Sequence, residues 1–202
     1  MPRPEPDRFA RCIATGGVAV FPADTVYGLA CDPESREAVA RLYALKGRPA
    51  GQPSAVMFFD AALAVDSLPE LGGRTRALLE RLLPGGVTLL LPNPRGRFGP
   101  ACGDDPRTLG LRVPAATPLA GVTTPVLQSS ANLHGGPDAR RVTDVPKAIR
   151  EAADLVIDAG ELPGTPSTVI DLRRFEAAGA WEIARLGAVA SEVVAGAVAA
   201  TA

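Results

Sequence analysis

The stretch Val18-Ala19-Val20-Phe21-Pro22-Ala23-Asp24-Thr25-Val26-Tyr27-Gly28-Leu29 places two apolar runs on either side of a polar turn. Residues 18–21 have the unbroken apolar character of a buried strand, and Pro22 ends that strand because proline cannot donate to a strand ladder. Asp24 and Thr25 form the turn, and either side chain can bond to the backbone there. The stretch therefore predicts a buried strand with polar side chains gathered at its end.

The rest of the chain continues this alternation irregularly. We expect a frayed start over residues 1–7, helices at about 8–15, 34–45, 60–66, 74–83 and 115–121, and a terminal helix from Ser191. Further strands are expected at 55–59, 87–91, 109–113, 125–128, 155–158, 168–172 and 181–185, with a loop at 92–107. This order predicts one α/β (α+β) domain over 1–202, with its core at about 10–190 and a twisted, mixed, largely parallel sheet flanked by helices.

The composition excludes several classes of protein. The formal net charge is −1, so any site for an anion must be local rather than a property of the whole surface. The three cysteines form no C-x-x-C pair and there is one histidine, which argues against a disulfide framework and against a metal cluster. With no apolar leader and no apolar run long enough to span a membrane, we expect a cytoplasmic protein.

Lys46 and Arg48 stand where the helix predicted at 34–45 ends, next to Gly47 and Pro49. Cations at a helix C-terminus are expected from the helix dipole alone, so a simple capping role is one interpretation. The other is a phosphate site. The common phosphate-binding signatures, G-x-x-x-x-G-K-[ST] and G-x-G-x-x-G, are missing, so a nucleotide would have to be held by dispersed residues.

Other short polar clusters also follow apolar strands. Arg112 is the most informative of them, because a charge flanked by Leu111 and Val113 is normally absent from a strand unless it is paired or faces a site. Strand ends gather on one side of a sheet, where open α/β folds bind ligands. The clusters expected to converge there are Asp24-Thr25, Lys46-Gly47-Arg48, Thr108 with Arg112, Ser129-Ser130-Ala131-Asn132, Ser167-Thr168 and Arg185.

In their order and spacing these clusters resemble the YrdC/Sua5 family of L-threonylcarbamoyladenylate synthases. The resemblance covers about residues 10–190. It rests on Phe21-Pro22-Ala23-Asp24-Thr25-Val26-Tyr27-Gly28-Leu29, Lys46-Gly47-Arg48-Pro49, Leu83-Pro84-Gly85-Gly86-Val87-Thr88, Ser129-Ser130-Ala131-Asn132 and Pro166-Ser167-Thr168-Val169-Ile170-Asp171, with support from Leu109-Gly110-Leu111-Arg112-Val113-Pro114 and Arg185-Leu186-Gly187.

The resemblance implies a YrdC-like (DHBP synthase-like) fold around a basic cavity and no C-terminal Sua5 domain. It implies a nucleotidyltransferase that joins L-threonine, bicarbonate and ATP, the last bringing Mg²⁺, into threonylcarbamoyl-AMP and pyrophosphate. The product serves t6A formation at position 37 of tRNA, with tRNA or the threonylcarbamoyl transferase complex as partners. Carried over by motif, the catalytic residues are Lys46 and Arg48, the threonine site is Thr25, Met57, Arg112, Gln128 and Ser167, and the nucleotide site is Lys46, Arg48, Gln52, Thr108, Ser130, Asn132 and Arg185.

Three positions depart from the family pattern: Ala23, Ser54 and Met57 stand where the family usually has a polar residue, Leu and His. Met57 bears on the threonine side, because a thioether is only a weak acceptor. It motivates one alternative, a domain that makes carbamoyl-adenylate from carbamoyl phosphate. A second alternative, a non-catalytic module that binds double-stranded RNA, is motivated by the basic cavity and opposed by the near-neutral net charge.

Overall fold

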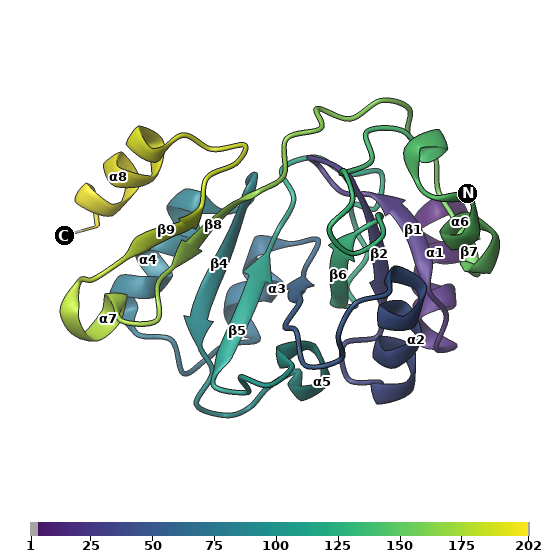
Figure 1. The fold of residues 1–202 in the computed structure, drawn as a ribbon. Helices are drawn as coiled ribbons and strands as arrows, with labels where there is room; N and C mark the ends of the chain where they lie inside the picture. The colour runs from purple at the N-terminus through teal and green to yellow at the C-terminus, as the bar shows by residue number, and fades with distance from the viewer. Residues whose placement is uncertain (1–3, 202) are drawn as a thin grey trace.

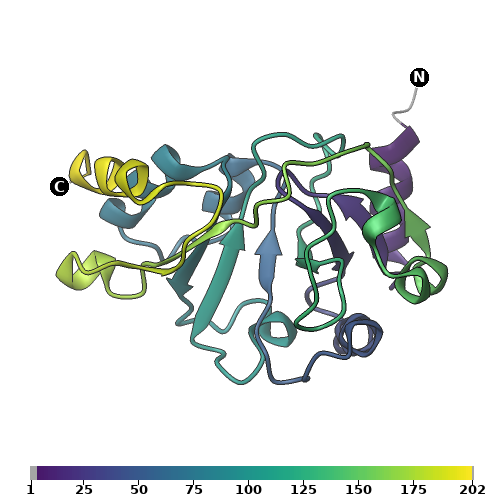
Figure 2. The same cartoon turned by 45° about the horizontal axis from the view of Figure 1, so that its top comes forward.

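The computed structural model describes residues 4–201, which form one twisted, mixed sheet with helices on both faces (Figures 1 and 2). Across the sheet the strand order is β7-β1-β2-β6-β3-β5-β4-β8-β9. The strands are β1 (Ala19–Pro22), β2 (Tyr27–Cys31), β3 (Ala55–Met57), β4 (Val87–Pro92), β5 (Thr108–Arg112), β6 (Val126–Ser130), β7 (Leu155–Val156), β8 (Thr168–Asp171) and β9 (Glu182–Arg185). The helices are α1 (Pro4–Ala14), α2 (Arg36–Lys46), α3 (Ala61–Asp66), α4 (Gly73–Leu82), α5 (Gly99–Cys102), α6 (Lys147–Ala152), α7 (Phe175–Ala178) and α8 (Ser191–Ala199), with a 3₁₀ turn at Val142–Asp144.

The strand pairings confirm a mixed sheet and correct its expected direction. Within residues 4–201, three pairs are parallel, namely β1 with β7, β3 with β5 and β4 with β8, and the other five are antiparallel. The expectation of a largely parallel sheet was therefore wrong. Part of the reason for the antiparallel pairs lies in short connections such as residues 23–26 between β1 and β2. A connection of this length can join antiparallel neighbours but cannot provide the crossover that parallel strands need.

Two hydrophobic clusters lie on opposite faces of the sheet. Successive side chains of a strand point to opposite faces, and in β1 Val20 joins a large cluster with Leu42 of α2, whereas Phe21 joins a smaller one with Phe9 of α1. Figure 1 shows α2 and α1 on the two sides of the β1–β2 region. The large cluster continues beneath α4, where Leu78 is fully buried.

Helix α2 ends where the sequence predicts. Ser35 caps its first turn by accepting a hydrogen bond from the Ala38 N–H at 3.2 Å, and Gly47 ends it in the left-handed conformation at φ 61°. Glycine suits that conformation because it has no Cβ to clash. The helix therefore delivers Lys46 on its last turn and Arg48 just beyond it.

The start of the chain is more regular than expected. Helix α1 begins at Pro4, so residues 4–7 are helical rather than frayed, while residues 1–3 lie outside the described part. Proline is tolerated in a first helical turn because no N–H is needed there. Glu5 and Asp7 also lie in that turn, where negative charge favours the helix dipole.

The helix expected at 115–121 is absent, since these residues form turns. Pro118 has no N–H to donate to a carbonyl one turn earlier. Instead the Thr117 hydroxyl accepts a hydrogen bond from the Leu119 N–H at 3.2 Å, and the Val122 N–H donates to the Leu119 carbonyl at 3.1 Å. In addition, the loop expected at 92–107 contains α5, and α6 and α7 were not expected. None of the helices described within residues 4–201 is both long and apolar enough to cross a membrane.

Candidate active site

A cavity of about 420 Å³ lies over the middle of the sheet, between the connection that follows α2 and the strands β5, β6 and β8. Its volume is in the range of small-molecule sites. The structure brings several of the predicted residues together on its lining, from segments far apart in the sequence. These residues are Arg48, Thr108, Arg112, Gln128, Ser130, Ser167 and Arg185.

Small residues at the floor of the cavity leave space for a ligand. Ala55 of β3 pairs with Gln128 of β6, and Gly110 of β5 is so close that a Cβ added there would lie 3.2 Å from the Ala55 Cα. Gly28 of β2 has another role: it lets the Gln128 side chain lie close to β2, since an added Cβ would lie 3.0 Å from Gln128 Nε2. Ala55 and Gly110 therefore form a floor without large side chains.

Lys46 lies just behind the cavity lining, with 2% of its surface exposed. Its ammonium donates to the Ser130 carbonyl, to the Asn132 carbonyl at 2.8 Å and to Asn132 Oδ1 at 2.9 Å. An ammonium group has three N–H donors, so this set engages all of them. Lys46 therefore ties the end of α2 to the turn that follows β6.

Burial lowers the pKa of Lys46 to about 8, with a further lowering from the Arg48 charge and an opposing effect from Asp138. Desolvation has this effect because it penalises the charged form of an amine. Asn132 completes the arrangement: its Oδ1 also accepts from the Ser130 hydroxyl at 2.8 Å, and its Nδ2 donates to the Gly136 carbonyl at 2.5 Å. A bound anion beside this group would favour the protonated lysine.

Arg48 lies on the cavity lining, and its guanidinium contacts Pro53 and Tyr43. Its Nη2 donates to the Pro53 carbonyl at 2.5 Å, and its guanidinium carbon lies 5.4 Å from the centre of the Tyr43 ring. Its Nε is buried without a hydrogen-bond partner in the described part of the chain. An unpaired buried donor is costly, so this N–H is a natural candidate to bind an acceptor in the cavity.

Arg112 is a buried cation with its own counterion. It ends β5 with 3% exposure, and its Nη2 donates to Asp24 Oδ1 at 2.5 Å and to Thr25 Oγ1 at 2.7 Å. Asp24 Oδ2 accepts from the Ala115 N–H at 3.1 Å, so both carboxylate oxygens are used. Burial lowers the pKa of Arg112 and the Asp24 carboxylate opposes that effect. The Nε of Arg112 is also buried without a partner among residues 4–201.

Two more predicted residues lie on the β8 side of the cavity. The Ser167 hydroxyl is 2.7 Å from the Thr88 hydroxyl, and Arg185 Nη2 donates to the Ser167 carbonyl at 2.8 Å. Across the floor, Gln128 is 7% exposed and its side-chain amide makes no hydrogen bond to any residue of the described chain. Gln128 therefore offers free donors and an acceptor to a ligand.

Some predicted residues are not on the cavity lining. Gln52 contributes a backbone carbonyl to the Tyr43 hydroxyl at 2.8 Å, and Thr25 and Asn132 act from behind residues that do line the cavity. Met57 is fully buried in the smaller cluster, with Phe21 and Val126. It could influence a ligand only through its neighbours.

Sequence reasoning did not assign three charged residues that line the cavity: Asp105, Asp138 and Arg173. Asp105 lies in the segment expected to be a plain loop, and Arg173 follows β8, where its Nε contacts Asp171 Oδ2 at 2.9 Å. With Arg48, Arg112 and Arg185 they give a lining of four arginines and two aspartates. The excess of positive charge is therefore local, as the net charge of the chain required. Asp105 and Arg173 had one sequence signal, a charge within three residues of a strand, whereas Asp138 lies in the long connection after β6 and had none.

Among residues 4–201 there is no group of three or more His, Cys, Asp or Glu residues that could hold a metal ion. The donors at the cavity are mainly guanidinium, amide and hydroxyl groups. Such a set suits anionic and polar ligands rather than a bare divalent cation.

Residues 11–187 match a family model for Sua5, YciO and YrdC, which is described as telomere recombination. A threonylcarbamoyl-AMP synthase of Stutzerimonas stutzeri is 35% identical over 176 residues, which are 83% of this chain and 92% of that protein. A second one, from Chromohalobacter salexigens, is 34% identical and covers 84% of this chain and 95% of that protein.

Among solved structures, Sua5 of Pyrococcus abyssi in complex with L-threonine matches 98% of this chain with a TM-score of 0.84 and 27% identity. The match spans 58% of the length of that archaeal protein. The family model covers most of the sequence and the solved structure shares its fold. This chain belongs to the Sua5/YciO/YrdC family.

Proposed function

We propose that this chain is a threonylcarbamoyl-AMP synthase, which forms L-threonylcarbamoyl-AMP and pyrophosphate from L-threonine, bicarbonate and ATP. The observation that carries the proposal is that one cavity has both Arg48 and Arg112 on its lining, each with a buried Nε that lacks a partner among residues 4–201. The relatives named threonylcarbamoyl-AMP synthase and the Sua5 structure with L-threonine support this choice of substrates.

ATP is assigned to one side of the cavity, which we call the phosphate wall and define as Lys46, Arg48, Ser130 and Asn132. Arg48 offers its unpaired N–H to a phosphate oxygen, and Lys46 adds positive charge from behind while holding the Ser130 carbonyl in place. Thr108, Gln52 and Arg185 complete the nucleotide assignment. Mg²⁺ arrives bound to ATP as part of the substrate.

L-Threonine is assigned to the acceptor wall, defined as Asp24, Thr25, Arg112 and Ser167, with Gln128 on the floor between the two walls. Because Nη2 of Arg112 is already used by Asp24 and Thr25, the substrate carboxylate is left with the other N–H groups of the guanidinium. The hydroxyls of Ser167 and Thr88 provide partners for the polar atoms of the amino acid.

The reaction needs positioning rather than a protein nucleophile. The amine of threonine and CO₂ from bicarbonate form a carbamate without covalent help from the enzyme. A carbamate oxygen then attacks the α-phosphorus, the new P–O bond forms, and pyrophosphate leaves with the electron pair of the broken bond. Fixed donors and cations stabilise the charge that grows on the phosphate oxygens, which is the role of Arg48, Lys46 and Arg185.

The test is pyrophosphate release by the purified chain with ATP, bicarbonate and L-threonine, with the adenylate product identified by mass. Turnover that requires both threonine and bicarbonate supports the proposal, and its absence rejects it.

Replacing these two substrates by carbamoyl phosphate tests the carbamoyl-adenylate alternative. Binding of double-stranded RNA over a range of salt concentrations tests the RNA alternative, since phosphate contacts weaken as salt rises. Transfer of the product to tRNA and a cytoplasmic location remain predictions.

A further inference from the structure

Arg48 is held both by helix α2 and by a neighbouring segment: its backbone N–H donates to the Tyr43 carbonyl at 2.9 Å, and its guanidinium reaches residues beyond the helix. Arg48 follows Gly47, which ends α2 in the left-handed conformation, and its guanidinium is hydrogen-bonded to the Pro53 carbonyl. Pro53 and Ser54 also line the cavity. Residues 51–54 therefore supply the hydrogen bond that directs the Arg48 guanidinium.

Residues 51–54 are held by the loop that joins β4 to β5, residues 93–107. The Asp104 N–H donates to the Gly51 carbonyl at 2.9 Å, and the Ser54 N–H donates to the Ala101 carbonyl at 2.8 Å. The two segments touch closely, since a Cβ added at Gly103 would lie 2.3 Å from the Gly51 oxygen. In Figure 1, α5 within this loop lies beside the chain that runs from α2 to β3.

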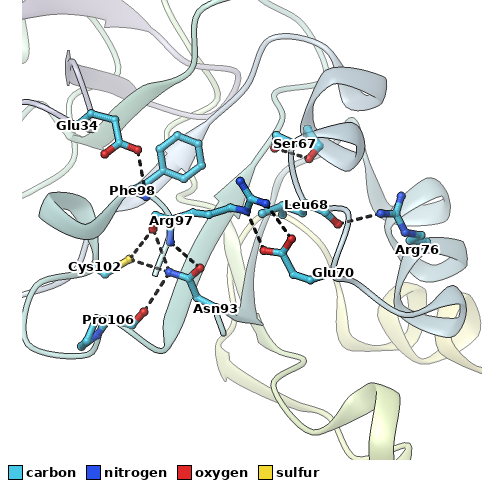
Figure 3. Close-up of polar contacts among 11 residues, drawn as sticks. Glu34, Ser67, Leu68, Glu70, Arg76, Asn93, Arg97, Phe98, Cys102 and Pro106 are labelled. Carbon is cyan, nitrogen blue, oxygen red and sulfur yellow. Dashed lines mark hydrogen bonds and ion pairs between the residues drawn. The ribbon is translucent and has the colours of Figure 1, made fainter. Parts of the chain in front are cut away.

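Asn93 closes this loop from inside (Figure 3). Its side chain is 2% exposed; Nδ2 donates to the Arg97 carbonyl at 2.9 Å and to the Pro106 carbonyl at 3.0 Å, and Oδ1 accepts from the Arg97 N–H at 3.0 Å. Its backbone N–H donates to the Arg107 carbonyl at 2.7 Å. One amide thus joins the two ends of the loop.

The outer side of the loop is anchored separately. Arg97 makes two hydrogen bonds to Glu70, at 2.8 and 3.1 Å, and the Phe98 N–H donates to Glu34 Oε1 at 3.2 Å (Figure 3). The inner side leads directly to Asp105 and Thr108, which line the cavity. Asn93 therefore joins the anchored side of the loop, which Glu70 and Glu34 hold, to the side that leads into the cavity lining.

We propose that Asn93 is a positioning residue for the nucleotide: by closing the 93–107 loop it sets the placement of Thr108 directly and of Arg48 through residues 51–54. This inference rests on the proposed function for the identity of the ligand. It assigns Asn93 no contact with substrate. The acceptor wall receives no hydrogen bond from residues 93–107 within the described chain.

The test compares Asn93→Ala with Thr75→Ala. Thr75 is a matched control because it is 1% exposed and its hydroxyl donates to Glu176 at 2.8 Å, outside the cavity lining. Asn93→Ala should raise KM for ATP about tenfold, the change expected when roughly one net hydrogen bond is lost, with KM for threonine within about twofold of the unmodified chain. Thr75→Ala should leave both constants unchanged. Equal effects of Asn93→Ala on both substrates, or none on ATP, overturn the inference.

Two further measurements keep the inference testable. If Asn93→Ala does not fold, Gly103→Ala disturbs the contact with Gly51 itself and must give the same preference for ATP over threonine. If the unmodified chain has no synthase activity, the proposed function fails separately. In that case the NMR signal of the Arg48 Nε–H, measured without nucleotide, decides: it must shift in Asn93→Ala and not in Thr75→Ala, and an unmoved signal rejects the role of Asn93.

Discussion

The phosphate wall and the acceptor wall each contain a buried cation, and the two are held in different ways. Lys46 is surrounded by neutral oxygens of Ser130 and Asn132, whereas Arg112 is paired with the Asp24 carboxylate at 2.5 Å. Lys46 has no carboxylate hydrogen-bonded to it, so its charge is available to a phosphate, while burial lowers its pKa to about 8 and Asp138 opposes that effect only through space. The ion pair balances the charge of Arg112, so Arg112 contributes directed N–H groups more than net charge.

This difference suits the two substrates. A triphosphate carries several negative charges and gains from an uncompensated cation, whereas an amino acid presents one carboxylate beside an amine that must be neutral to form a carbamate. A strong positive field at the acceptor wall would favour binding of other anions there. The two walls therefore separate charge stabilisation from orientation.

The largest effect is expected from Asp24→Ala. Removing one partner of a buried ion pair leaves an uncompensated charge, which costs about 3–5 kcal/mol, and here it also leaves the Ala115 N–H without its acceptor. The free energy of unfolding should fall by that amount in urea titrations, and threonine-dependent turnover should be lost. Glu161→Gln removes an exposed acid that pairs with Arg140 and Arg141 and should change little. Equal stability losses in the two variants would contradict the role given to Asp24.

Lys46→Ala should lower turnover by about 10²-fold, the scale seen when a charge-stabilising donor is lost. It should also lower stability, because Ser130 and Asn132 lose the group that joins them to α2. Lys147 is the matched control, since it is the other lysine of the chain and lies exposed on α6. Steady-state kinetics and thermal melts of both alanine variants give the comparison. Normal turnover of Lys46→Ala would show that Lys46 only caps the end of α2 and has no role in catalysis.

The pH dependence should be smaller and should have opposite signs for activity and stability. Above about pH 8 Lys46 loses its proton in the folded protein, so kcat/KM for ATP should fall. Its folded pKa lies below the ordinary value of 10.5, so between about 8 and 10.5 the unfolded chain binds more protons and stability from this group rises with pH. In Lys46→Arg both trends should disappear. Activity that is flat up to pH 9.5 in the unmodified chain would argue against a catalytic charge on Lys46.

Hydropathy and turn chemistry predicted most of the elements because the strands are buried and their ends carry proline, glycine or polar residues. The direction of the sheet was not predictable in this way, since local patterns do not state which strands become neighbours. The same limit explains Asp24: its turn role followed from local chemistry, and only the fold places it beside Arg112, 88 residues away. Lys46 and Arg48 were located correctly at a helix end. Their different surroundings depend on β6 and residues 51–54: Lys46 is saturated with acceptors, whereas Arg48 has an Nε without a partner in the described part of the chain.

Met57 gives the last and smallest test. It stands where the family usually has histidine, which suggested a changed substrate contact, yet it is fully buried with Phe21 and Val126 and is not itself on the cavity lining, although its strand partner Arg112 is. Met57→His should therefore leave the ratio of kcat/KM for threonine over serine within about twofold, since no substrate contact changes. It should instead lower stability by about 1–3 kcal/mol, because an imidazole in that apolar cluster has no partner.

Met57→Leu is the control for size, and a volume-conserving swap of this kind costs less than about 1.5 kcal/mol. The three proteins are compared in one series of threonine and serine titrations together with urea unfolding. A large gain in threonine preference on Met57→His would show that the acceptor wall extends to β3. In that case the acceptor wall would also include a titratable group, because the imidazole would lie beside the ion pair of Arg112 and Asp24. Charge and orientation would then not be separated between the two walls.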